Sequence, residues 1–456
     1  GELWGCLTDT AINLVRDLVP AYTVEEQQQA LLLAQEQLFS YGFTSAVNAG
    51  TTVQGLENFK ALYESGEMKL RTYPMIMLTT DLTSPEAEYI RTHAPSEELY
   101  DNRMLVRGVK IVGDGSLGSR SSAMLEDYSD APGTKGEYRF TDEQMYEAVK
   151  LAYDNGYQTG VHAIGDGTNH QVLNAYERVM EENPREDARL RIEHFQIITA
   201  EDMQRALDMG ILPAMQFTHA TSDSNMAEDR IGSERIKTAY AWRTVLDAGS
   251  IIIGGSDAPV EKVNPFHGLY AGVTRMTRAG EPEGGWYPEQ KVTREEALRA
   301  FTIWAAYGQF EEDLKGSLEP GKLADFIIID RDYMTCPEAD IKDIQVLATY
   351  VGNELVYTKD TSAPTVVWQG DPLTFNRELV VEPGTIYVPL SDVVNGISAQ
   401  STVSGGIATV TLDGKTASVP VKDVNGAQYV GIRALMEGLG YHTNWYPDGA
   451  CVSIGK

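Results

Sequence analysis

Helix-like and strand-like hydrophobic patterns alternate along the chain from Thr23 to about residue 257. The capping box at Thr23 and a second helix start at Thr141 are typical of amphipathic helices. Between such helices lie seven short apolar runs, which we interpret as strands: 44–47, 73–78, 106–112, 158–163, 190–194, 212–217 and 251–254. Connections long enough for a helix predict an α/β fold with a parallel sheet. An unbroken series favours a TIM-like (β/α) barrel, although seven strands are one fewer than the eight of a closed barrel.

The pattern changes after two further helices, near 265–278 and 294–306. Residues 323–330 and 346–357 read as strands outside the alternation, and 358–374 reads as a linker. Beyond it, Ile386–Val394 resembles Gln428–Met436 at an offset of 42 residues. Two such β-helix-β copies predict a small C-terminal α+β module.

The charge balance limits the partners of the chain. Lys and Arg number 37 against 66 Asp and Glu, a net charge of −29, which argues against nucleic acid and anionic membranes because both are polyanions. The three cysteines (Cys6, Cys336 and Cys451) are far apart, which excludes a disulfide scaffold and a cysteine-rich zinc site. No apolar run approaches the roughly 18–20 residues of a membrane span.

Four residues at the ends of predicted strands could hold a metal ion. His162, His194 and Asp257 offer imidazole and carboxylate donors, and Lys110 lies on a fourth strand. In a barrel the active site forms at the C-terminal ends of the strands, so we expect these side chains to converge on a divalent metal. Lys110 fits this set if its neutral amine has captured carbon dioxide as a carbamate, which would bridge two ions. Taken singly, each residue could instead be a core, turn or salt-bridged position.

Two further residues are candidates for binding substrate. His219 lies just after a predicted strand, either at the barrel mouth or in an unrelated loop, and Arg120 could bind a carboxylate or be a simple surface residue. Arg120 follows Gly113–Gly118, which matches a dinucleotide-binding glycine pattern. A long loop is predicted where that motif requires a helix, so a nicotinamide oxidoreductase would depend on the glycines alone.

At these residues the chain resembles the metal-dependent amidohydrolase superfamily, in particular the subgroup of N-substituted formamide deformylase-like enzymes. The similarity lies in five segments that occur in order: 109–120, 162–166, 192–194, 255–259 and 316–326. It implies a distorted barrel over 1–322, flanked by β-sandwich strands at 323–357. It also implies that Lys110, His162, His194 and Asp257 bind one or two divalent ions, zinc first, for hydrolysis of small amides. Asp257 would in addition carry the proton from the attacking water to the leaving nitrogen.

The chain departs from the family pattern in two respects. The family places a His-x-His pair on its first barrel strand, and no two histidines here are separated by one residue. The first barrel strand of the family is also absent, which explains the count of seven. We therefore expect this chain to begin partway through the enzyme, with the second metal site incomplete and the activity of the isolated chain in question. The alternative is a non-catalytic extracellular binding or scaffold protein on an amidohydrolase barrel.

The segment 375–456 resembles the small repeat domain of the N-terminal region of copper amine oxidases, a domain also found on exported bacterial surface proteins. Its single histidine, His442, gives no reason to expect copper. This resemblance implies an extracellular or cell-envelope setting in a bacterium, with cell-wall association through the module. The sequence predicts neither an oligomeric state nor a named substrate.

Overall fold

The computed structural model describes residues 12–16, 18–359, 365–369, 371–382, 385–446 and 451–455. The chain divides into two compact units, Gly1–Tyr357 and Thr358–Lys456, and each has its own hydrophobic core. Part of the predicted linker 358–374 lies outside the described residues.

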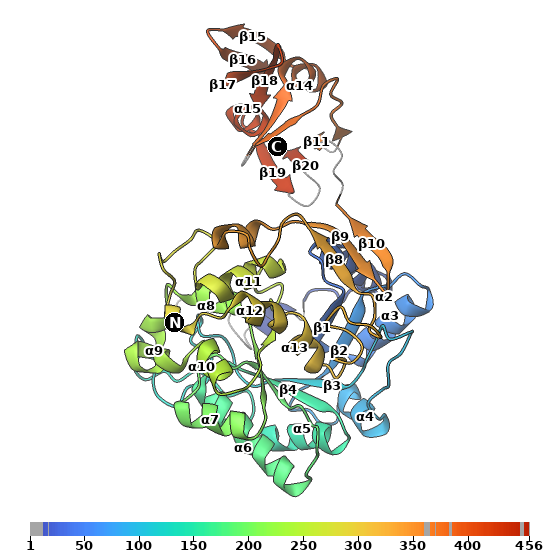
Figure 1. Cartoon of the computed structure of the whole chain (residues 1–456), viewed down its shortest axis with the longest axis vertical. Coiled ribbons are helices and arrows are strands. Elements are labelled where there is room, and N and C mark those ends of the chain that lie inside the picture. The colour runs from blue at the N-terminus through green and yellow to red at the C-terminus, as the bar shows by residue number, and fades with distance from the viewer. Residues whose placement is uncertain are drawn as a thin grey trace. The chain divides into compact units, whose positions relative to one another are not determined.

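A seven-stranded parallel sheet forms the centre of the first unit (Figure 1). Its strands pair in chain order: β1 (Ser45–Thr51), β2 (Arg71–Leu78), β3 (Gly108–Val112), β4 (Gln158–Ala163), β5 (Arg191–His194), β6 (Leu212–Met215) and β7 (Ile253–Gly254). The series of parallel strands predicted from the sequence, and with it the TIM-like barrel class, is confirmed. β1 and β7 are the two edges of the sheet.

Helices cover the outer side of this sheet (Figure 1). The helices described in this unit are α1 (Asn13–Arg16), α2 (Val24–Ser40), α3 (Val53–Glu64), α4 (Pro85–Thr92), α5 (Asp142–Asp154), α6 (Asp166–Glu182), α7 (Ala200–Asp208), α8 (Phe217–Asp223), α9 (Ala227–Arg235), α10 (Trp242–Asp247), α11 (Pro265–Thr274), α12 (Arg294–Ala300) and α13 (Ile303–Tyr307). The capping boxes at Thr23 and Thr141 are both formed, so these two helices begin where their sequence signals predict.

Three helices differ from their predicted extents for local backbone reasons. The helix expected near 234–248 is wrong as a single element, because Tyr240, between α9 and α10, adopts a left-handed φ of 50°. The helix expected near 265–278 ends at Thr274, since Arg275 has a φ of 56°. The one expected near 294–306 is broken at Thr302, whose φ and ψ of −128° and −99° are not helical.

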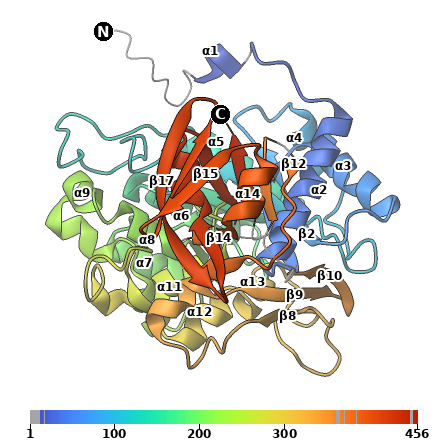
Figure 2. The ribbon, with the colours of Figure 1, turned by 90° about the horizontal axis from the view of Figure 1, so that it is seen from above.

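A three-stranded sheet of order β10-β9-β8 completes the first unit: β8 (Phe326–Ile329), β9 (Val346–Val351) and β10 (Glu354–Thr358). It lies beside α2, as Figure 2 shows, and the Thr349 hydroxyl of β9 donates to the carbonyl of Phe39 at 2.7 Å. These are the strands predicted over 323–330 and 346–357.

The described residues of the second unit form two sheets and two helices. Their bounds are β11 (Thr365–Trp368), β12 (Asp371–Pro372), β13 (Val380–Glu382), β14 (Thr385–Pro389), α14 (Leu390–Gly396), β15 (Gln400–Ser404), β16 (Ile407–Leu412), β17 (Lys415–Val424), β18 (Ala427–Gly431), α15 (Ile432–Gly438), β19 (His442–Tyr446) and β20 (Cys451–Gly455). The two copies of the sequence repeat form β14–α14 and β18–α15, and β14 and β18 pair antiparallel.

Candidate functional site

The four predicted site residues lie on, or just after, four strands of the parallel sheet. Lys110 lies in β3, His162 in β4 and His194 at the end of β5, while Asp257 follows β7 by three residues. Lys110 and His194 are buried, with 6% and 7% of their surface exposed, and the His162 side chain is 17% exposed. The structure therefore brings these side chains to the C-terminal ends of the strands, as a barrel requires.

The histidines are in direct ring contact. The ring centroids of His162 and His194 are 4.4 Å apart in an edge arrangement, and those of His194 and His219 are 5.5 Å apart. His219 lies on α8, so the loop alternative is wrong for this residue. Its Nε2 is buried without a hydrogen-bond partner and lies 3.8 Å from Oδ2 of Asp257. Three imidazoles and one carboxylate thus share the same end of the barrel.

Burial sets the charge state of these groups. It lowers the pKa of His194 well below the ordinary histidine value, and the charges of His162 and Lys110 lower it further. Burial also lowers the pKa of His219 to about 4. Both rings are therefore neutral at pH 7, which is the form that binds metal ions.

Lys110 and Asp257 are shifted in opposite directions. Burial lowers the pKa of Lys110, against the opposing charges of Glu193 and Asp257. Burial raises the pKa of Asp257, against the charges of Lys110 and His162. A lysine that is more easily neutral and a carboxyl that retains a proton more readily are both suited to proton-transfer chemistry.

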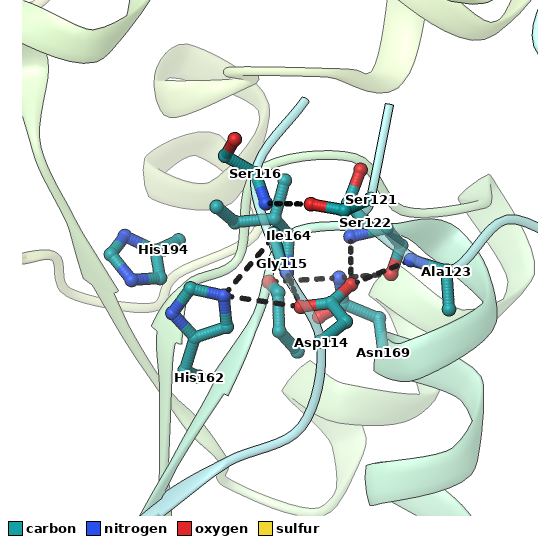
Figure 3. A network of polar contacts seen from close by, with 12 residues as sticks. Asp114, Gly115, Ser116, Ser121, Ser122, Ala123, His162, Ile164, Asn169 and His194 are labelled. Atoms are coloured by element: carbon teal, nitrogen blue, oxygen red, sulfur yellow. Dashed lines mark hydrogen bonds and ion pairs between the residues drawn. The ribbon is translucent and has the colours of Figure 1, made fainter. Parts of the chain in front are cut away.

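Hydrogen bonds determine which ring nitrogens are free. Nδ1 of His194 is 2.8 Å from Oε1 of Gln216, whose amide group donates to the carbonyl of Ala214 at 3.2 Å. The Gln216 oxygen can only accept, so Nδ1 of His194 carries the proton and Nε2 the lone pair. Nε2 of His162 faces the carboxylate of Asp114 at 3.1 Å and the carbonyl of Gly115 at 3.3 Å (Figure 3).

The donor set fits a first-row divalent ion in its chemistry, because both rings have their hydrogen committed and a lone pair left. Within the described ranges, however, no three His, Cys, Asp or Glu side chains form a group that could hold a metal ion. A third ligand beside His162 and His194 would therefore have to come from Lys110, which provides a negative donor only as a carbamate.

Arg120 is paired with an aspartate in the loop that follows β3. Its guanidinium donates through Nε and Nη2 to Asp130, at 2.9 and 2.8 Å, and Asp130 also pairs with Arg230. Its bidentate geometry is thus already used within the loop that follows β3. A role of Arg120 in binding substrate stays a prediction.

Two cavities are lined by elements that carry or adjoin the site. One, of about 430 Å³, is lined by Asn48 and Gly50 at the end of β1 together with α2 and α3. A Cβ on Gly50 would lie 3.8 Å from Cγ of Lys110. The other, of about 320 Å³, is lined by Thr218 of α8 and by Lys262 from the loop after β7. Both cavities have room for a small molecule, and neither is lined by one of the four predicted residues.

Two polar residues that hold the histidines, Asp114 and Gln216, were not among the predicted site residues. Asp114 lies in the glycine-rich turn directly after β3, and that position at a strand end was the available signal. Gln216 lies directly after β6 and 22 residues from its partner His194, and no sequence motif joins them.

Comparison with known proteins identifies the family of the chain. The profile of the amidohydrolase family matches residues 1–357. The chain is 32% identical over 368 residues to Protein LONG AFTER FAR-RED 3 of Arabidopsis thaliana, covering 78% of this chain and 62% of that protein. It is 27% identical to N-substituted formamide deformylase of Arthrobacter pascens, covering 79% of this chain and 67% of that protein.

A solved structure agrees with the profile match. The uncharacterized metal-dependent hydrolase from Pyrococcus furiosus superposes with a TM-score of 0.61 at 27% identity, over 72% of this chain and 65% of that one. The chain thus spans less than two thirds of the length of the Arabidopsis relative and of this structure. The resemblance predicted from the strand-end motifs is confirmed, and the chain belongs to the amidohydrolase family.

Proposed function

We propose that the first unit is a metal-dependent hydrolase of C–N bonds of the amide type in small molecules. The observation that carries the proposal is the convergence of Lys110, His162, His194 and Asp257 at one end of the parallel sheet. The similarity to a protein named as a formamide deformylase supports the amide class of substrate. The similarity to a protein described as a metal-dependent hydrolase supports the use of a metal.

Lys110, His162, His194 and Asp257 are the residues that would hold the ion, for which zinc is our first candidate. Such an ion would supply Lewis-acid chemistry, polarising a carbonyl group and making water more acidic. His194 would use Nε2, since its Nδ1–H donates to Gln216. Carboxylation of Lys110 would replace a repelling ammonium by an anionic oxygen donor.

Asp257 is the group suited to move the proton. Its side chain is 34% exposed, which leaves it accessible to water and substrate, while burial raises its pKa. It would accept a proton as water adds to the amide carbonyl and return that proton to the nitrogen as the C–N bond breaks. Nε2 of His219, 3.8 Å from this carboxylate and without a hydrogen-bond partner, would be free to contact substrate.

The test combines metal analysis with hydrolysis of a panel of N-formyl and N-acetyl amines. We expect bound divalent metal, loss of turnover with a chelator, and recovery with zinc. His194→Ala should lose metal and activity. His170→Ala, on α6 and paired with Asp202 outside the site, is the matched control and should retain both. A chain that hydrolyses these amides equally well without metal would refute the proposal.

A second candidate function is a non-catalytic binding protein on the same barrel. It is favoured by one observation: among the residues that the structure describes, no His, Cys, Asp and Glu group is ready to hold an ion. In that case the chain would take up no zinc at micromolar concentration, and His194→Ala would leave small-molecule binding unchanged. The metal titration separates the two functions.

For the second unit we propose an extracellular or cell-envelope setting with cell-wall association, on the resemblance of its repeat. None of the helices among the described residues is long and apolar enough to cross a membrane. Sedimentation of the whole chain with purified peptidoglycan, compared with residues 1–357 alone, tests the association. Equal sedimentation of both would refute a role of the second unit.

A further inference from the structure

Asp114 is a fully buried carboxylate whose two oxygens accept three backbone hydrogen bonds and make an ion-pair contact with His162 (Figure 3). Oδ1 lies 3.1 Å from both the backbone nitrogen of Ile164 and Nε2 of His162. Oδ2 accepts from the backbone nitrogens of Ala123, at 3.0 Å, and Gly165, at 2.9 Å. The carboxylate therefore joins the end of β4 to the loop between β3 and α5.

These contacts determine the tautomer of His162. Both neighbours of its Nε2, the Asp114 carboxylate and the Gly115 carbonyl, can only accept a hydrogen bond, so the proton must be on Nε2. In the neutral ring, Nδ1 then carries the lone pair. In Figure 3, Nδ1 is on the side of the ring towards His194, with which His162 is in ring contact.

The same carboxylate docks the loop onto the start of α6. The helix begins after Gly165, which has no side chain to cap it. The carbonyl of Ala123 instead accepts from the backbone nitrogens of Gly167, at 3.0 Å, and Thr168, at 3.3 Å. Oδ2 of Asp114 accepts from the backbone nitrogens of both Ala123 and Gly165, which keeps Ala123 beside the start of α6. The Ala123 carbonyl can therefore serve as the acceptor that the helix N-terminus needs.

We propose that Asp114 is a positioning residue, which fixes Nε2 of His162 as the protonated nitrogen and so presents Nδ1 to the metal site only while the 115–139 loop is docked. This goes beyond the proposed hydrolysis and depends on it only for the identity of the ligand. The tautomer of His162 is a property of the metal-free chain and can be measured whether or not the chain hydrolyses amides.

Asp114→Asn separates the two roles of the carboxylate. If the amide nitrogen takes the place of Oδ2, it faces the two backbone donors of Ala123 and Gly165. If it takes the place of Oδ1, it faces the Ile164 donor and weakens the preference of His162 for the Nε2–H form, because the amide N–H favours a lone pair on Nε2 while only the Gly115 carbonyl still favours the proton there. Either orientation breaks the link between loop and ring, because an amide has one acceptor oxygen where the carboxylate has two.

The experiment uses the whole chain labelled with ¹⁵N-histidine and freed of metal. In the wild type we expect the ¹⁵N signals of His162 to show the Nε2–H tautomer, assigned by comparison with His162→Gln. In Asp114→Asn we expect a shift towards Nδ1–H and a 10- to 100-fold weaker affinity for Zn²⁺ in a titration, a range typical of losing a partner that orients a ligand.

Asp202→Asn is the matched control. Asp202 is also a buried aspartate, 4% exposed, and it contacts Nδ1 of His170 at 3.0 Å away from the candidate site. This variant should change neither the His162 signals nor Zn²⁺ affinity. An Nδ1–H tautomer of His162 in the wild type overturns the proposal even if Asp114→Asn does not fold. An unchanged tautomer and Zn²⁺ affinity in a folded Asp114→Asn also overturns it. Wild-type chain that shows the Nε2–H tautomer but binds no Zn²⁺ would refute the metal function and, with it, the presentation of Nδ1 to a metal, and would support only the tautomer assignment.

Discussion

Replacing Gly165 by alanine tests whether the loop after β3 is held to the barrel by close backbone contact. The φ of Gly165 is −74°, which alanine adopts freely, so the backbone itself would not be strained. The added Cβ, however, would lie 2.6 Å from the carbonyl carbon of Ala123 and 2.9 Å from its nitrogen. Backbone atoms cannot swing aside as a side chain can, so the loop would have to move outward.

The magnitude follows from the contacts that this movement breaks. Ala123 would leave the hydrogen bonds that it makes with Gly167, Thr168 and Asp114. Two or three bonds at about 1 kcal/mol each, with overpacking strain of about 1–3 kcal/mol, predict a loss of about 3–6 kcal/mol of stability in the barrel unit. The carbonyl of Gly115 and the carboxylate of Asp114 would shift with the loop, so Zn²⁺ affinity should fall too.

Gly118→Ala is the matched control in the same loop. A Cβ there would meet only the terminal methyl of Met226, at 3.5 Å, an ordinary contact. Stability is measured by chemical denaturation, with hydrogen exchange in peptides of the barrel unit reporting its unfolding. Limited proteolysis at residues 115–139 reports whether the loop has moved. The reasoning is refuted if Gly165→Ala is within about 1 kcal/mol of Gly118→Ala, a difference too small for the overlap inferred here.

Three further outcomes are expected. Lys315 is 6% exposed and pairs with a buried carboxylate, so Lys315→Met should lower the free energy of unfolding by about 3–5 kcal/mol in urea denaturation. Lys237→Met, in an exposed pair, should lower it by less than about 1 kcal/mol. Equal losses in the two variants would contradict this. Burial lowers the pKa of His267 to about 4. Because the unfolded chain binds the proton first, stability should fall by up to about 3 kcal/mol as the pH drops from about 6.5 to 4. His267→Gln should flatten this slope in Tm measurements, and an unchanged slope would count against it. Gln216→Leu leaves Nδ1 of His194 without its acceptor and should weaken Zn²⁺ binding about 10- to 100-fold by calorimetry; unchanged binding would show that Gln216 does not orient the ring.

The strand order of the barrel could be predicted because each buried strand is a short apolar run between helix signals. The positions of β3, β4 and β5 agree with the predicted runs to within two residues. β7 is the weakest case, since it has only two residues, Ile253 and Gly254, and is defined by pairing with β6. Helix ends were less predictable where a single residue such as Tyr240 or Arg275 takes a left-handed conformation, because neither residue type signals one.

The candidate site was predictable to the extent that strand ends are. Lys110, His162 and His194 belong to consecutive strands, so their proximity follows from the parallel order alone. Of the partners that orient the two histidines, Gln216 was not predictable, and Asp114 offered only its position just after β3 as a signal. Their role depends on hydrogen bonds between segments brought together by folding, and an aspartate or glutamine at a strand end has no pattern of its own.

The backbone conformation of two site residues indicates that the geometry of the site depends on the packed barrel. His194 and Asp257 have φ values of 76° and 56°, in the left-handed region that residues with a Cβ rarely adopt. Each such residue costs of the order of 1–3 kcal/mol and persists only where surrounding contacts hold it. For His194 those contacts include the hydrogen bond to Gln216 and the ring of His162. The conformation that presents a neutral imidazole and a proton-accepting carboxylate is thus unfavourable locally and is stabilised by neighbouring strands, which ties any activity of this site to the integrity of β4, β5 and β6.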